Sequence, residues 1–169
     1  MTRPDSTEYV QYFGKYISLV PGDTIVTTLS DQIETTLKLL QSLSEPQGEL
    51  RYAPGKWSIK EVIGHLIDTE RIFAYRALRI ARDDRTPLSG FDENNYIANS
   101  NFDARRLAEI ADEFEVVRKA NVYLLRHLDD EAWMRRGVAN ENEISVRAIA
   151  YIMAGHELHH LEIIRSRYL

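Results

Sequence analysis

Apolar residues recur every three or four positions along four long segments of the chain, which is the spacing of one face of an α-helix. The segments cover residues 23–43, 58–82, 104–128 and 145 to near the C-terminus. No pair of segments shows the alternating pattern that is typical of neighbouring β-strands. The sequence therefore predicts an all-α fold, a four-helix bundle with long connections, in a single domain over residues 1–169.

Residues at the ends of these segments predict where the helices begin. Asp23 follows Pro and Gly and is the expected N-cap of the first helix. Ser58 and Glu61 have the spacing of a capping box, and Ser145 is the expected N-cap of the last helix. Asp129 is expected to cap a short helical turn. The connection over residues 83–103 is long, and connections of that length are often functional or carry a short helix.

The composition limits the class of protein. At 44% hydrophobic and 28% charged residues, the chain is in the range of soluble globular proteins. Its net charge of -5 disfavours a nucleic-acid partner, which needs concentrated positive charge. No signal peptide and no stretch of about 18–20 apolar residues is seen, so no membrane partner is expected. With no cysteine, disulfides and thiolate ligands are excluded, and we expect a cytoplasmic protein.

The C-terminal stretch "AGHELHHLEIIRSRYL" contains three histidines, and His156, Glu157 and His160 match the H-E-x-x-H pattern of zinc metalloproteases. On a helix, His160 lies about 40° from His156, inside the apolar stripe that faces the bundle. His159 lies at the edge of that stripe. Two inward imidazoles at i and i+4 are close enough to share one metal ion. Histidines packed in the core with separate polar partners are the alternative.

A third ligand is expected from a facing helix, and His65 in the second helix is the candidate. Thr69 and Arg76 lie on the same side of that helix and are candidates for binding substrate, with Arg76 as a contact for an anion. An exposed histidine and a surface ion pair are the alternatives for His65 and Arg76. Asp68 is a candidate for orienting a ligand histidine, and a solvent-facing role is its alternative.

The metalloprotease hypothesis is weak for this chain. Only nine residues follow His160, which leaves little room for a downstream third ligand, and no strand precedes the motif to align a peptide. Glu157 is either a group near a metal-bound water or a surface charge. Glu70 falls inside the apolar stripe of the second helix, where an unpaired carboxylate is costly. We expect it to pair with an arginine of a facing helix, with Arg147 as the first choice.

The stretches "GKWSIKEVIGHLIDTERIFAYRALRIAR", "PLSGFDENNYIANSNFD" and "VRAIAYIMAGHELHHLEIIRSRYL" resemble the DinB-like family of four-helix bundles. This family includes the YfiT-type proteins, which are assigned as metal-dependent hydrolases. The resemblance covers nearly the whole chain. It implies that three histidines hold a divalent metal, often nickel or zinc, and by position these are His65, His156 and His160.

The resemblance implies a class of chemistry and leaves the reaction open. Related proteins include thiol S-transferases that use bacillithiol or mycothiol and a mycothiol-dependent isomerase. We therefore expect a hydrolase or thiol S-transferase in which the metal activates water or a low-molecular-weight thiol cofactor toward a small-molecule substrate. A metal-binding stress-response protein without turnover is one alternative, and a homodimer whose helices form an interaction surface is another.

Overall fold

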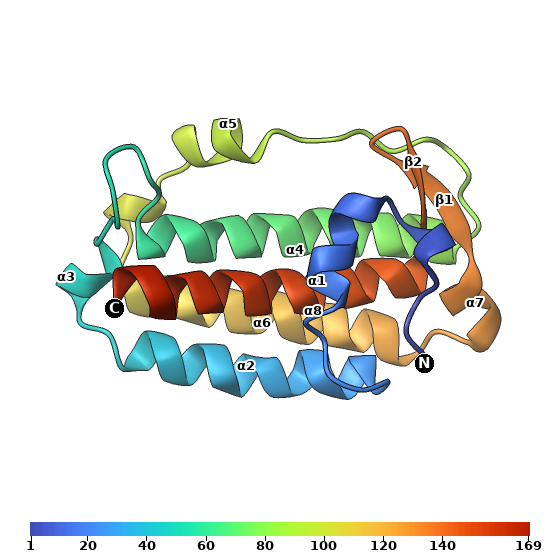
Figure 1. Ribbon diagram of the computed structural model, residues 1–169, viewed down its shortest axis with the longest axis horizontal. Coiled ribbons are helices and arrows are strands. Elements are labelled where there is room, and N and C mark those ends of the chain that lie inside the picture. Colours follow the sequence, from blue (N-terminus) through green and yellow to red (C-terminus); the bar gives the residue numbers. More distant parts are fainter.

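A computed structural model describes residues 1–169, and most of them are helical. Four long helices lie side by side and form the bundle, which confirms the all-α prediction (Figure 1). No helix has both the length and the apolar character that crossing a membrane requires. The long helices are α2 (Ile25–Gln41), α4 (Ile59–Ala81), α6 (Leu107–Arg126) and α8 (Val146–Ile163).

Shorter elements connect these helices or precede them. Single turns of 3₁₀-helix lie at Ser6–Glu8, Gln11–Phe13 and Phe102–Ala104, and a π-helical turn ends the chain at Ile164–Tyr168. The remaining elements are α1 (Gly14–Ile17), α3 (Glu45–Gly48), α5 (Glu93–Ala98), α7 (Asp130–Met134), β1 (Arg136–Ala139) and β2 (Asn142–Ser145).

The bundle helices do not pack in chain order. Each of α2 and α4 contacts α6 and α8, so α2 lies diagonally opposite α4, and α6 lies diagonally opposite α8. Following the colours in Figure 1, α2 and α8 run in one direction and α4 and α6 in the other. Because α4 and α6 run in the same direction, the chain between them must return along the whole bundle. The long 82–106 connection does this, and α5 lies within it, as its length suggested.

Side-chain caps fix the helix starts largely where the sequence predicts them. The Ser58 hydroxyl accepts a hydrogen bond from the Glu61 amide at 3.1 Å, and the Glu61 carboxylate accepts from the Ser58 amide at 2.8 Å. Ser145 caps α8 through the Ala148 amide at 3.0 Å. The first long helix differs from its prediction, since α2 begins at Ile25 after Thr24 and Asp23 lies outside it.

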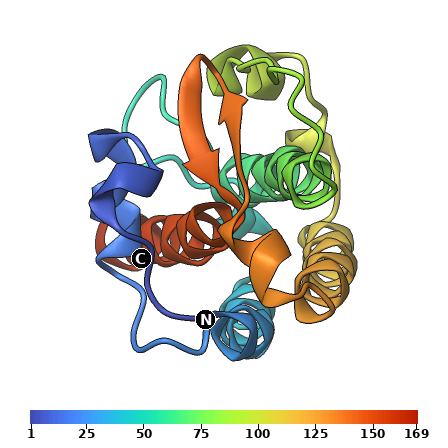
Figure 2. The same ribbon diagram turned by 90° about the vertical axis from the view of Figure 1, so that its right-hand side faces the viewer.

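The β-hairpin of β1 and β2 corrects the expectation that no strand pair is present. The strands are antiparallel, with Arg136 opposite Ser145, and Asn140 and Glu141 form the turn with positive φ angles of 50° and 65°. Such a two-residue turn matches the right-handed twist of the strands, and asparagine tolerates it well. Each strand has only four residues, which is too short for an alternating pattern to be recognised in the sequence. Seen along the bundle, the hairpin stands beside the N-terminal segment (Figure 2).

The N-terminal segment (residues 1–20) is tied to the start of α8. Arg147 donates from Nε to the Glu8 carboxylate at 2.8 Å and also pairs with it through Nη2. Burial opposes ionisation of Glu8, but hydrogen bonds from Arg147 and Ser145 outweigh this and lower its pKa to about 2. The prediction that Arg147 pairs with Glu70 is therefore wrong. Arg147 pairs with Glu8, which lies outside the helical patterns of the sequence.

A buried polar layer crosses the middle of the bundle and supplies the true partner of Glu70. Arg118 of α6, which is fully buried, donates from Nη2 and Nε to the two Glu70 oxygens at 2.8 and 3.0 Å. Its Nη1 lies 2.7 Å from Glu157 Oε2, and Thr36 donates to the other Glu157 oxygen. This layer separates the two apolar clusters of the core, one toward each end of the bundle.

Gly155 of α8 allows α1 to lie directly on the bundle. A Cβ atom built at this glycine would lie 2.0 Å from the carbonyl oxygen of Tyr16, which is backbone and has no rotamer to change. We expect Gly155→Ala to displace α1, to lower the free energy of unfolding by about 2 kcal/mol or more as overpacked sites do, and to expose the N-terminal segment to proteases. Urea unfolding and limited proteolysis measure both effects, and Gly14→Ala in the same α1 is the control, because its φ is -55° and its Cβ would meet only the Tyr9 ring at an ordinary 3.8 Å.

Candidate metal centre

Three imidazoles from two antiparallel helices meet beside α1. His65 extends from α4, and His156 and His160 extend from successive turns of α8. The Nε2 atom of His156 lies 3.1 Å from that of His65 and 3.0 Å from that of His160. Each side chain offers one potential ligand atom, and these three atoms all lie within 4.8 Å of one another. The structure thus brings together the three side chains that the sequence selected, and the exposed-surface alternative for His65 is wrong, since the residue is 7% exposed.

Burial keeps these imidazoles neutral. Loss of solvent lowers the pKa of His65 to about 4. Burial, with the other histidines adding to it, lowers the pKa of His160 to about 3 and that of His156 well below its ordinary value. Near neutral pH all three side chains therefore carry lone pairs and no charge, which is the form that binds metal ions.

The donor set fits a divalent cation better than it fits hydrogen bonding alone. In a neutral imidazole each ring nitrogen either donates or accepts, so Nε2 of His156 cannot satisfy both neighbours. A cation accepts all three lone pairs at once. Nitrogens bound to zinc at about 2.1 Å in a tetrahedral arrangement lie about 3.4 Å apart, close to the separations seen here. Three imidazoles without a carboxylate or thiolate suit zinc, nickel, copper and iron.

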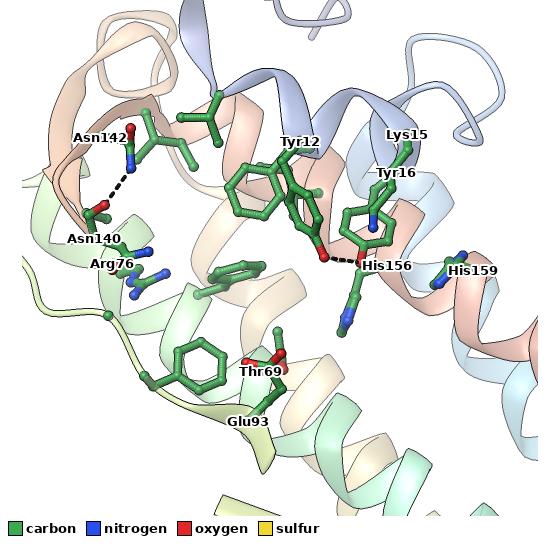
Figure 3. A pocket seen from close by; sticks show the side chains of 18 of the residues that line it. Tyr12, Lys15, Tyr16, Thr69, Arg76, Glu93, Asn140, Asn142, His156 and His159 are labelled. Atoms are coloured by element: carbon green, nitrogen blue, oxygen red, sulfur yellow. Dashed lines mark hydrogen bonds between the residues drawn. The ribbon is translucent and has the colours of Figure 1, made fainter. Parts of the chain in front are cut away.

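A cavity of about 580 Å³ opens beside the three histidines. Figure 3 shows this cavity with His156 at one end and Arg76 at the other. It runs along α4 between the N-terminal segment, the loop that follows α4 and the β-hairpin. Trp57 packs against His65 with ring centroids 4.9 Å apart, and Phe73 and Phe91 line the cavity further along. The histidines thus lie at one end of a cavity large enough for a small molecule and are not sealed in the core.

The other residues singled out in the sequence have different surroundings. Thr69 lines the cavity, and its hydroxyl lies 3.5 Å from Nδ1 of His65. Arg76 lines the cavity too, is 6% exposed and forms no ion pair, so a surface ion pair is the wrong description. Of the two alternatives for Asp68, the structure shows no contact with a ligand histidine. Asp68 lies 3.9 Å from Arg71 at the surface, because its position on α4 turns it away from the cavity.

Glu157 differs from both alternatives considered for it. It is fully buried, so it is not a surface charge, and it does not line the cavity. Its carboxylate faces Thr36 and Arg118 in the polar layer, and burial raises its pKa. The glutamate that completes the H-E-x-x-H pattern is therefore a core residue, and the protease hypothesis loses its general base.

The cavity contains residues that the helical patterns could not identify. Tyr16 of α1 packs edge-on against His156 and His159, with ring centroids 5.3 Å apart in both pairs. The Tyr12 hydroxyl lies 3.3 Å from that of Tyr16, and the Lys15 ammonium lies 3.9 Å from the centre of the Tyr12 ring. The signal for these residues in the sequence is the aromatic run "YVQYFGKYI", because an N-terminal segment that remains in solvent is seldom so rich in aromatic side chains.

The sequence model of the DinB superfamily matches residues 28–164, which include all three histidines. The chain belongs to the DinB superfamily. This confirms the resemblance seen in the helix sequences. A comparison with curated proteins finds no match.

The solved structures that share the fold of this superfamily member include YfiT and a mycothiol-dependent isomerase. YfiT from Bacillus subtilis, described as a probable metal-dependent hydrolase with an unusual four-helix bundle topology, is 18% identical with a TM-score of 0.72. That match covers 96% of this chain and 91% of YfiT. The mycothiol-dependent maleylpyruvate isomerase is 11% identical with a TM-score of 0.69, over 86% of this chain and 61% of the isomerase. At these identities the likeness establishes the fold.

Proposed function

We propose that this chain binds a divalent metal ion, nickel or zinc, through His65, His156 and His160, and that it is a metal-dependent hydrolase or thiol S-transferase. The observation that carries the proposal is the convergence of three neutral imidazoles at one end of a cavity. A cation bound there lowers the pKa of a water or thiol ligand toward neutrality, and so supplies a nucleophile.

The chain's own residues prepare the site for that chemistry. Thr69 lies beside Nδ1 of His65 and restricts the orientation of the ring, which leaves Nε2 directed at the other two histidines. Tyr16 and Trp57 pack against the imidazoles and exclude bulk water from two sides. Because the chain has no cysteine, a thiol that takes part must come from a small cofactor. The mycothiol dependence of a structural neighbour supports that choice.

The cavity favours an enzyme over a protein that only stores or is stabilised by metal. A structural metal site is usually closed by four protein ligands, whereas a catalytic site has three and a position open to solvent or substrate. Three histidines and an adjoining cavity match the second description. A metal-binding stress-response protein without turnover is the second candidate function, and the four-helix bundle is compatible with it.

Metal analysis of the protein purified without a histidine tag tests the proposal. We expect about one nickel or zinc ion per chain, because the structure contains one three-histidine group. Hydrolase and thiol-transfer screens with that metal should then reveal an activity that a chelator removes and the metal restores. Protein that retains neither metal after incubation and desalting would contradict the metal site. Bound metal with no activity and a closed ligand shell would favour the second candidate.

A further inference from the structure

Arg76 is a buried arginine that lacks a carboxylate partner. Four lysine and arginine side chains are buried, and each of the other three pairs with an acid: Lys60 with Glu45, Arg118 with Glu70, and Arg147 with Glu8. Arg76 instead donates from Nη2 to the Ser89 carbonyl at 2.7 Å, and its other nitrogens have no acceptor in the protein. An unpaired buried cation is costly unless something compensates it.

The surroundings of Arg76 are those of a binding site. Its guanidinium carbon lies 5.5 Å from the centre of the Phe73 ring and 5.8 Å from that of Phe91, so the side chain is held between two aromatic residues. Asn140 and Asn142, at the turn of the β-hairpin, line the same end of the cavity (Figure 3). The Arg76 nitrogens that have no acceptor in the protein are not completely enclosed by it. They are therefore free to donate to a molecule in the cavity.

The cavity connects Arg76 with the three histidines. Both Arg76 and His65 are on α4, and their separation of eleven positions corresponds to about 16 Å along the helix. No other charged residue of the cavity wall forms an ion pair with Arg76. Glu143 pairs with Arg136 at 2.6 Å, and Glu93 lies by Thr69. Lys15 is at the tyrosine pair near the histidines. The Arg76 end thus has one uncompensated positive charge.

We propose that the cavity binds an elongated monoanion whose carboxylate pairs with Arg76 while its other end lies at His65, His156 and His160. This assigns a substrate class to the proposed function and rests on it. A single guanidinium matches the geometry and the charge of one carboxylate, which it binds through two parallel hydrogen bonds. A phosphate dianion would need a second cation. Phe73 and Phe91 on the cavity wall suit an uncharged chain between the two ends, and Glu93 beside Thr69 disfavours a second negative charge there.

Binding of synthetic probes to the zinc-loaded protein tests the proposal by isothermal titration calorimetry. Sebacic acid monohydroxamate has a zinc-binding hydroxamate at one end and a carboxylate at the other, and its primary amide has the same length without the charge. We expect the acid to bind about 10- to 100-fold more tightly than the amide, as a charge-assisted hydrogen bond requires. Arg76→Gln should abolish this preference, and Arg82→Gln, an exposed arginine at the end of the same helix, should keep it.

Chain length and a metal-free probe make the test decisive. Succinic acid monohydroxamate is too short to span the cavity, so it should bind with no preference over its amide. Decanoate binding to the metal-free protein, lost in Arg76→Gln, would support the carboxylate position even if no metal were bound. Equal binding of acid and amide by the wild type, or equal decanoate binding by wild type and Arg76→Gln, would overturn it. Failure of the metal site appears separately, as loss of hydroxamate binding for every chain length.

Discussion

Replacing His156 with alanine is expected to abolish stoichiometric binding of nickel or zinc. The Nε2 atom of His156 lies between those of His65 and His160, so the substitution removes the central one of the three proposed ligands and leaves two. Loss of a residue that only supports a ligand weakens metal binding about 10- to 100-fold, and loss of a ligand should exceed about 100-fold. Elemental analysis after desalting and titration of the metal-free protein measure the effect.

His159→Ala is the matched control for that experiment. His159 lies on the same turn of α8 and packs against Tyr16, but it does not belong to the three-histidine group. The His159→Ala protein should therefore retain about one metal ion per chain. Circular dichroism should show the same helix content in both variants, because the removed imidazole is neutral and the bundle contacts of α8 remain. A full complement of metal in His156→Ala would refute the assignment of the ligands.

Replacing Arg118 with methionine should destabilise the bundle more than the change of any surface charge. Methionine keeps an unbranched apolar stem but lacks the guanidinium, so the substitution leaves the Glu70 and Glu157 carboxylates buried without a counter-charge. Breaking a buried ion pair by removing one partner costs about 3–5 kcal/mol of the free energy of unfolding. Urea unfolding, followed by circular dichroism, measures this loss.

Two further variants separate the buried charge from general damage. Arg71→Met removes a surface pair with Glu113 and should cost less than about 1 kcal/mol. Adding Glu70→Gln and Glu157→Gln to Arg118→Met should recover part of the stability, because the amides need no counter-charge. An Arg118→Met protein as stable as the wild type would show that the polar layer does not hold the helices together.

The bundle could be predicted because its helices are long and amphipathic. Seventeen or more residues in each gave enough repeats for the apolar spacing to be recognised, and Ser58 and Ser145 marked two of the starts. The β-hairpin could not be predicted in this way. Its strands contain Arg136, Asn142 and Glu143 and bury little, so packing against the rest of the protein decides their structure.

The candidate site was predictable where its residues follow helical spacing and not elsewhere. His156 and His160 share a face of α8, and His65 has a defined position on α4, so spacing alone could bring them together. Tyr16 and Asn140 line the same cavity from the N-terminal segment and the hairpin. Their positions depend on how α1 and the β-hairpin pack on the bundle, which no local pattern in the sequence records.

Glu157 shows where the helical pattern was misleading. An apolar stripe implies a helix with one buried face, and a glutamate beside the stripe then appears to lie at the surface. In the structure every residue from Val146 to Glu157 is buried, because α1, α2 and α4 all pack around α8. The nearly continuous apolar run "VRAIAYIMAG" before His156 was the sign of a central helix.

The N-terminal segment also bears on how the cavity can be altered. Tyr12, Lys15 and Tyr16 line the cavity and lie outside the range matched by the superfamily model, which begins at residue 28. The three histidines lie inside that range, on α4 and α8. One wall of the cavity and the three-histidine group therefore come from separate parts of the chain, and substitutions at Tyr12 and Lys15 are a direct route to changing the choice of ligand.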